Sequence, residues 1–249
     1  MKPPRRNLSL PGAIIFFAGI LLGLFLSGWS LWGDVEASIM VFRTGEQAIA
    51  LHCPLMLTST ELGSVSADFT NPTVDEINPT FHAVISHPGQ PRTAYTILTI
   101  EPAGKKPLQW QVGPQDKVFG GLILVNIFET SQRNFPSHQG SCGIPVLGLP
   151  NFPGLTGELV FILMFLASLI GMVAGAVLWV QGNSPLRGLI GNATNACAAL
   201  AALVILDLLL IFPGWWGLSL LFFFLTIMLV VIIITQFVLF PTDADRGER

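Results

Sequence analysis

The side chains that could do chemistry lie mostly in the middle of the chain. All four histidines fall there: His52, His82, His87 and His138. A zinc or other transition-metal site needs several ligands at short, defined spacing, and these histidines follow no CxxC, HxH or HExxH pattern. The GxSxG, P-loop and dinucleotide-binding motifs are missing from the sequence as well. We therefore expect no metal, no cofactor and no catalytic residues, and we interpret the histidines as ordinary surface side chains.

The charged residues point to no enzymatic or nucleic-acid chemistry either. The net charge is −3, and no block of Lys or Arg forms the basic stripe that phosphate binding needs. The carboxylates of the central region are interpreted as a solvated surface and not as a paired acid–base site: Glu46, Glu61, Asp68, Asp75, Glu76 and Asp116. We expect a non-enzymatic protein with no nucleic-acid partner.

Two of the three cysteines lie in this central region and the third lies in an apolar stretch. Cys53 and Cys142 are expected to form a disulfide that joins the beginning and end of one domain, provided that the domain lies in an oxidising compartment. Free thiols or metal ligands are the alternatives. Cys197 is interpreted as a small buried apolar side chain.

One acid stands within an otherwise apolar stretch. Asp207 would lie inside a membrane, where a carboxylate costs about 2.5–3.5 kcal/mol on insertion scales, so it is a functional candidate. It either binds a partner or couples to transport, or it is an acid tolerated close to the membrane boundary. Asn192 and Asn195 are the other polar candidates of the same stretch.

The elements that hold these residues follow from hydropathy. Apolar residues make up 51% of the chain and charged residues only 11%, well below a typical globular protein. Four stretches are long enough for helices that cross a bilayer: 13–32, 159–180, 189–212 and 218–240. Five of the six tryptophans stand near the ends of these stretches, where amphipathic rings prefer to lie. A cleaved signal peptide is the alternative for the first stretch, but its apolar run is longer than usual.

Topology follows from the basic residues that flank the spans. Lys2, Arg5, Arg6, Arg187, Arg246 and Arg249 predict that both termini are cytosolic. The expected organisation is a cytosolic N-terminus with helix 1 (1–32), an extracytosolic domain (33–157), helices 2–4 (158–240) and a cytosolic tail (241–249). Small residues spaced by four indicate close helix packing within one bundle in preference to dimerisation, at Gly19, Gly23, Gly171 and Gly175.

Period-two alternation predicts strands in the outer domain. In residues 63–69, Val65, Ala67 and Phe69 share one face. Further strands are expected at 38–42, 47–51, 81–86, 94–100, 108–112 and 122–128, the first two forming a hairpin. Short strands at this spacing favour an antiparallel β-sandwich inserted between helices 1 and 2.

Part of this region resembles bacterial immunoglobulin-like domains. Residues 98–104 (LTIEPAG) and 108–112 (LQWQV) look like the strand, Pro/Gly turn and Trp-containing strand of such domains, and residues 65–72 look like their strand that ends in an Asn-Pro turn. The resemblance covers less than half of the domain. It implies a sandwich fold and a binding role, and it carries over no catalytic residue.

The function expected from these features is binding. An accessory, assembly or surface-binding subunit would use its outer sandwich to recognise another membrane or surface protein, while the four helices lie in lipid. Loops 71–78, 87–92 and 133–140 are the candidate sites, with Arg133, Phe135 and His138 in the last. The alternative is a small oligomeric transporter or channel component that uses Asp207.

Overall fold

The computed structural model describes residues 8–40, 47–130, 138–149, 154–184, 186 and 188–235. The chain divides into two compact units, which we call the helical unit (Met1–Gly28 with Leu163–Arg249) and the strand unit (Trp29–Ile162). The connection within the expected hairpin of 38–42 and 47–51, the basic residues that flank the spans, and Arg133 and Phe135 lie outside the described residues.

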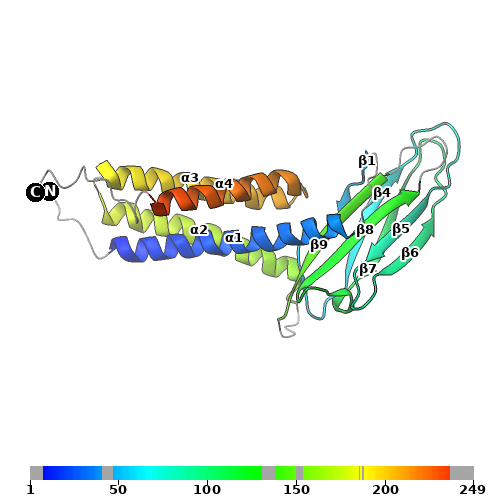
Figure 1. The fold of residues 1–249 in the computed structure, drawn as a ribbon, viewed down its shortest axis with the longest axis horizontal. Helices are drawn as coiled ribbons and strands as arrows, with labels where there is room; N and C mark the ends of the chain where they lie inside the picture. Colours follow the sequence, from blue (N-terminus) through cyan, green and yellow to red (C-terminus); the bar gives the residue numbers. More distant parts are fainter. Residues whose placement is uncertain are drawn as a thin grey trace, which may run out of the picture. The chain divides into compact units, whose positions relative to one another are not determined.

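Four helices of the described chain are long and apolar enough to cross a membrane, as the hydropathy predicts. They are α1 (Ser9–Ile39), α2 (Gly157–Gly182), α3 (Gly188–Ile211) and α4 (Trp216–Ile234). Their parts in the helical unit run side by side (Figure 1). Many of their large apolar side chains are exposed, among them Phe25, Leu163, Ile170 and Phe224, as expected of helices that face lipid.

The small residues permit the closest approaches in the helical unit. A Cβ added at Gly19 would lie 2.7 Å from the Met172 nitrogen of α2, and one at Gly175 would lie 2.3 Å from the Phe16 nitrogen of α1. The same approach lets the Ser168 hydroxyl donate a hydrogen bond to the Gly19 carbonyl at 2.8 Å. Gly23 instead meets the Val204 side chain of α3. Larger residues at these positions would force the helices apart.

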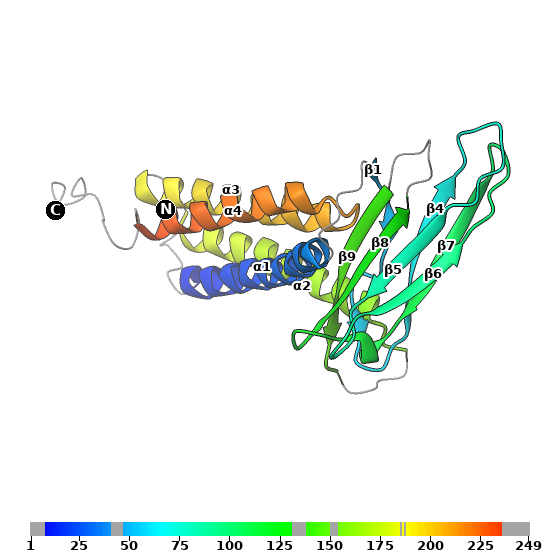
Figure 2. The ribbon, with the colours of Figure 1, turned by 45° about the vertical axis from the view of Figure 1, so that its right-hand side comes forward.

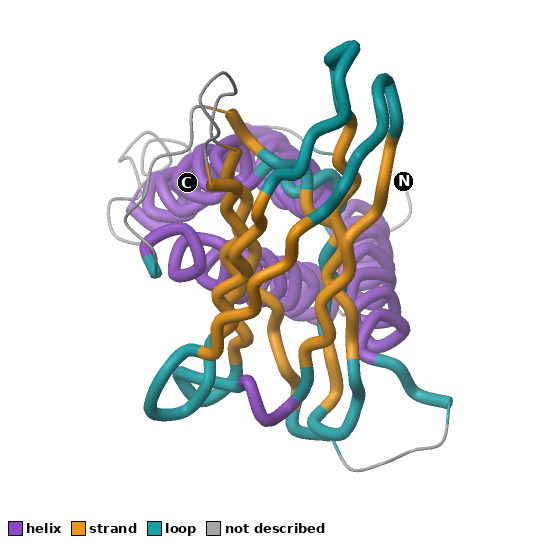
Figure 3. Tube along the Cα trace, turned by 90° about the vertical axis from the view of Figure 1, so that its right-hand side faces the viewer, coloured by secondary structure: helices purple, strands orange, loops and turns teal. Residues whose placement is uncertain are grey.

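The strand unit contains two sheets (Figures 2 and 3). The larger orders its strands β1-β9-β8-β5-β6, with β3 also paired to β9, and the smaller orders them β2-β4-β7. The strands are β1 (Gln47–Ala48), β2 (Leu51–His52), β3 (Leu57–Thr58), β4 (Gly63–Thr70), β5 (Thr80–Ile85), β6 (Arg92–Ile97), β7 (Lys105–Val112), β8 (Leu122–Thr130) and β9 (His138–Leu147), with a short 3-10 helix, η2 (Pro114–Asp116), between β7 and β8.

One hydrophobic core joins the two sheets. The inward faces of β4 and β7 contribute Val65, Ala67, Phe69 and Trp110, as the alternation of β4 predicts. Strands β5, β8 and β9 contribute the facing apolar side chains, and the rings of Phe69 and Phe81 meet with centroids 3.8 Å apart. Burial of this face is the main stabilising contribution to the unit, because apolar area removed from water contributes roughly 25 cal/mol per Å².

The prediction of a strand at 38–42 is wrong for its first two residues, because α1 continues to Ile39. Asp34 and Glu36 look like the end of an apolar span, but this part of α1 belongs to the strand unit and packs on its larger sheet. Ala37 is fully buried beside Leu122 and Leu124 of β8, and the Asn126 amide donates to the Ala37 carbonyl at 3.3 Å. The helix therefore extends seven residues beyond the predicted end, from 32 to 39, because a sheet covers its inner face.

Two further expectations about the strands are corrected. The sheets are not wholly antiparallel, because the short strands β1 and β3 each pair with β9 in parallel. Strand β9 itself was not expected. Its two internal glycines and Pro145 are typical of a loop, but Gly140 is needed because a Cβ there would lie 2.6 Å from the Ile49 carbonyl.

Candidate binding surface

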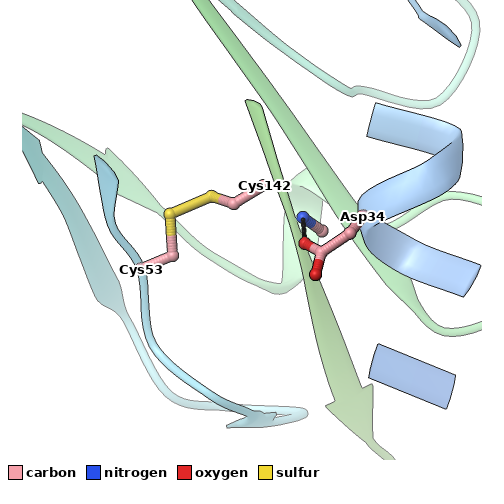
Figure 4. Close-up of a disulfide and its surroundings, with 4 residues drawn as sticks. Asp34, Cys53 and Cys142 are labelled. Carbon is pink, nitrogen blue, oxygen red and sulfur yellow. Dashed lines mark hydrogen bonds between the residues drawn. A yellow bond between two sulfur atoms is a disulfide. The ribbon is translucent and has the colours of Figure 1, made fainter. Parts of the chain in front are cut away.

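Cys53 and Cys142 form the predicted disulfide, with their Cα atoms 6.7 Å apart. The bond connects the segment after β2 to the centre of β9, and therefore links the two sheets. Figure 4 shows that Asp34 of α1 lies close to the same part of β9. The Gly143 N–H, between the parts of β9 that pair with β1 and β3, donates to the Asp34 carboxylate at 2.9 Å. The Asp34 side chain thus satisfies a backbone donor that pairs with no strand in the described part of the chain.

Asp116 is fully buried, which corrects its interpretation as a solvated surface acid. Its carboxylate accepts hydrogen bonds from Arg92 Nε at 3.0 Å, Arg92 Nη2 at 2.9 Å and the Gly113 N–H at 3.0 Å. Arg92 also donates to the Gln111 carbonyl of β7. This pair therefore ties the start of β6 in the larger sheet to the end of β7 in the smaller one.

The three predicted binding loops do not form one surface. Loop 71–78 follows β4 and is ordered by the buried Asn71, whose amide donates to the carbonyls of Asp75, Ile100 and Glu101. Loop 71–78 precedes β5, whereas loop 87–92 follows it and so lies at the other end of that strand. At this end the Ser86 N–H donates to the Leu124 carbonyl, near the start of β8. His138, predicted to lie in the third loop, is instead the first residue of β9. Its Nδ1 lies 2.6 Å from the Glu129 carboxylate.

The outer face of the larger sheet is covered on one side and open on the other. Residues 29–39 of α1 cover β8 and β9, as the burial of Leu122 and Leu124 shows. On β6, in contrast, Tyr95 is 67% exposed and Ile97 is 71% exposed. The His82 ring of β5 lies between two aromatic rings, 4.4 Å from Tyr95 and 4.8 Å from Phe128 of β8. We call Tyr95, Ile97, His82 and Phe128 the aromatic face.

The aromatic face adjoins a free strand edge. Within the described chain β6 pairs only with β5, and β7, beside it in Figure 2, pairs only with β4. Strand β7 begins Lys105-Lys106-Pro107, and lysine and proline are common protections of an edge strand against unwanted pairing. Strand β6 has the sequence RTAYTI, in which only Arg92 is charged, and Arg92 is already bound to Asp116. The edge of β6 is therefore the less protected of the two.

The predicted intramembrane polar residues do not converge. Asp207 is fully buried and accepts a hydrogen bond from Ser219 of α4, whereas Asn192 and Asn195 are exposed. Asn195 precedes Asp207 by 12 residues, or about 18 Å along the helix at 1.5 Å per residue. A polar link between α2 and α3 that was not expected from the sequence is the Trp179 indole, which donates to the Thr194 hydroxyl at 3.0 Å.

The described histidines also lie apart, and no group of three or more His, Cys, Asp or Glu side chains in the described residues could hold a metal ion. Each of three histidines has its own neighbour: His82 stacks on Phe128, His87 lies 3.6 Å from Asp116, and His138 meets Glu129. The β6 part of the aromatic face could have been found in the sequence from Tyr95 and Ile97, which alternate with Ala94 and Thr96 and so place two large side chains on one face.

No family model matches the chain, and no curated protein matches it. Solved structures resemble parts of it at low similarity. A Paenibacillus sp. cycloisomaltooligosaccharide glucanotransferase has 15% identity and a TM-score of 0.34, over 42% of this chain and 14% of that one. The CARDB domain of a Pyrococcus furiosus protein, in complex with di-metal ions, has 12% identity and a TM-score of 0.33, over 44% of this chain and 99% of that one. A Bacteroides uniformis β-glucuronidase has 9% identity and a TM-score of 0.31, over 39% and 13%. These similarities carry no argument about activity or partners.

Proposed function

We propose that this protein is a non-enzymatic multi-pass membrane protein whose strand unit binds an extended segment of another membrane or surface protein along β6. The observation that carries the proposal is the free edge of β6 with two large exposed side chains, Tyr95 and Ile97, on the adjoining face. An added strand would gain main-chain hydrogen bonds from the edge, while alternate side chains would pack on the aromatic face.

The chemistry of the edge specifies the partner. Tyr95 and Ile97 are separated by one residue and lie on the same face, so the partner segment should carry apolar side chains at alternate positions. Complete burial of a large apolar side chain contributes about 1.5–3 kcal/mol, so the two side chains would contribute a few kcal/mol before the cost of ordering the segment. No charge is required of the partner, because Arg92 is already paired with Asp116.

The placement of the strand unit is part of the proposal. We place residues 33–157 outside the cytosol as an immunoglobulin-like sandwich, with both chain termini in the cytosol. The flanking Lys and Arg residues and the disulfide, which is typical of oxidising compartments, support this topology. A membrane-impermeant thiol reagent should label a cysteine introduced at Asp75, and not one introduced at Ser9, in intact cells. Labelling of the Ser9 position would contradict the topology.

Co-purification in mild detergent tests the binding proposal. Tyr95→Lys and Ile97→Lys should each remove the partner, because a lysine on this face opposes strand addition. Leu62→Lys is the matched control, since Leu62 is also exposed, at 70%, but lies before β4. Val74→Lys tests loop 71–78 in the same way. Loss of the partner with Val74→Lys, and its retention with both β6 variants, would reject the β6 edge in favour of the loop.

A further inference from the structure

The helical unit encloses a carboxyl group that has no charged partner among the described residues. Asp207 of α3 is 0% exposed. Its Oδ1 accepts a hydrogen bond from the hydroxyl of Ser219 on α4 at 2.5 Å. Its Oδ2 is buried and has no hydrogen-bond partner among the described residues. The Ser27 side chain of α1, also fully buried, lies near the same carboxyl group.

The sequence offers this carboxyl group no counter-charge within the bundle. Residues 13–32, 159–186 and 188–240 contain no Lys, Arg or His. Asp207 is the only acid in these three ranges, and Cys197 is the only other side chain of α3 that can titrate. An unpaired carboxylate in a dry apolar interior is so unfavourable that such a group is normally neutralised.

Three ligands could in principle neutralise Asp207: a basic side chain of a partner helix, a metal cation or a proton. A partner helix cannot reach the group in this structure because the side chain is completely covered. A hard metal cation takes about six or more oxygen ligands, whereas the surrounding side chains supply one carboxyl group and the hydroxyls of Ser219 and Ser27. A proton needs only one oxygen, and Oδ2 is the one without a partner.

We propose that Asp207, with Ser219 and Ser27, forms a proton-binding site of the helical unit in which the acid is neutral. The proton resides on Oδ2, and Oδ1 remains the acceptor for Ser219. The Ser27 hydroxyl already donates to the Leu24 carbonyl at 3.3 Å, which leaves its lone pairs to accept the acid proton. Release of the proton would leave an unpaired carboxylate between α1, α3 and α4, so it requires these helices to separate and admit water. This inference is independent of the β6 proposal.

Infrared spectroscopy of the full chain in lipid nanodiscs tests the site directly. The spectrum should be recorded at slightly alkaline pH, with aspartate carboxyl groups isotopically labelled. The difference between wild type and Asp207→Asn should contain the carbonyl band of a protonated carboxylic acid that the variant lacks. Asp68→Asn is the control, because Asp68 is exposed and paired with Lys105, and it should remove carboxylate bands only.

A second variant keeps the test valid if Asp207→Asn fails to fold. Ser219→Ala retains the acid but removes the hydrogen bond to Oδ1, so the carbonyl band should remain and shift to higher frequency. The proposal is overturned if Asp207→Asn removes carboxylate bands, or if Ser219→Ala leaves the acid band unshifted. A band that appears only when sodium is withdrawn would also overturn it, since it would identify a metal cation as the resident ligand.

Discussion

Removal of Arg92 should destabilise the strand unit more than removal of its partner, Asp116. The Asp116 side chain is 0% exposed, whereas the Arg92 side chain is 43% exposed. Arg92→Gln leaves a buried carboxylate whose remaining neighbours are the Gly113 N–H, at 3.0 Å, and the His87 ring, at 3.6 Å. Loss of one member of a buried ion pair costs about 3–5 kcal/mol, and the exposure of Arg92 places the expected loss near the lower limit, at about 3 kcal/mol.

Asp116→Asn has a smaller expected cost. The guanidinium of Arg92 can be solvated through its exposed side, and the asparagine oxygen can still accept one hydrogen bond. Loss of a hydrogen bond to a charged group costs about 1.5–3 kcal/mol, and solvation of Arg92 reduces this to about 1–2 kcal/mol. The double variant removes the buried charge and should therefore be more stable than Arg92→Gln alone.

Hydrogen–deuterium exchange of the full chain in detergent is the appropriate assay. Amides of β6 and β7, which the pair connects, report the free energy of opening of the strand unit. The reasoning is refuted if Asp116→Asn lowers this free energy as much as Arg92→Gln does. It is equally refuted if the double variant is the least stable of the three, because the two losses would then simply add.

Three other changes have defined outcomes. Cys53→Ser removes the disulfide, which joins two residues 89 positions apart in the sequence. The chain-entropy model gives a loss of about 4.6 kcal/mol in the free energy of unfolding, which chemical denaturation would measure. Gly143→Ala places a Cβ 1.9 Å from the backbone of α1. It should lower thermal stability by an amount equivalent to about 2 kcal/mol or more. Gly148→Ala is the control and should leave thermal stability unchanged, because its Cβ meets nothing within 4 Å. The hydrogen bond from Lys105 lowers the pKa of Asp68 below its usual range. Its contribution is therefore present above the pKa of an unfolded aspartate and is lost as the pH falls through the lower folded value, so Asp68→Asn should flatten the acid side of a stability–pH profile.

Each of these three predictions would be contradicted by a specific result. A wild-type midpoint unaffected by reductant would show that the disulfide does not stabilise the fold. Equal midpoints for Gly143→Ala and Gly148→Ala would mean that α1 does not approach β9 as closely as the structure indicates. A stability–pH profile of Asp68→Asn with the wild-type slope in acid would remove the contribution assigned to the pair with Lys105.

The sequence was sufficient where a structural feature depends on local pattern. Hydropathy predicts the four helices, because a bilayer-spanning helix must be apolar along its whole length. Alternation predicts β4 within one residue of its observed end, because Val65, Ala67 and Phe69 face one core. The disulfide was predictable because two cysteines stand near the beginning and end of one domain.

The sequence was insufficient to predict the burial or secondary structure of a residue whose partner lies far away along the chain. Asp116 looks exposed until Arg92, 24 residues away, is placed beside it. Strand β9 looks like a loop because its glycines are required by segments far from it in sequence, Ile49 and the end of α1. The continuation of α1 through Asp34 and Glu36 likewise depends on β8 and β9, which provide the surface for Ala37 and the donor for Asp34.

Site-specific photo-crosslinking along β6 tests the central proposal most directly. A photoreactive amino acid introduced in turn at Tyr95, Thr96 and Ile97 should give adducts with one partner from positions 95 and 97, where the side chains lie on the exposed face. Position 96 should give little or none, and Tyr95→Lys should abolish the adduct from position 97. Adducts that form equally at all three positions, or that form only from position 74 in the loop after β4, would contradict the binding of an added strand at β6.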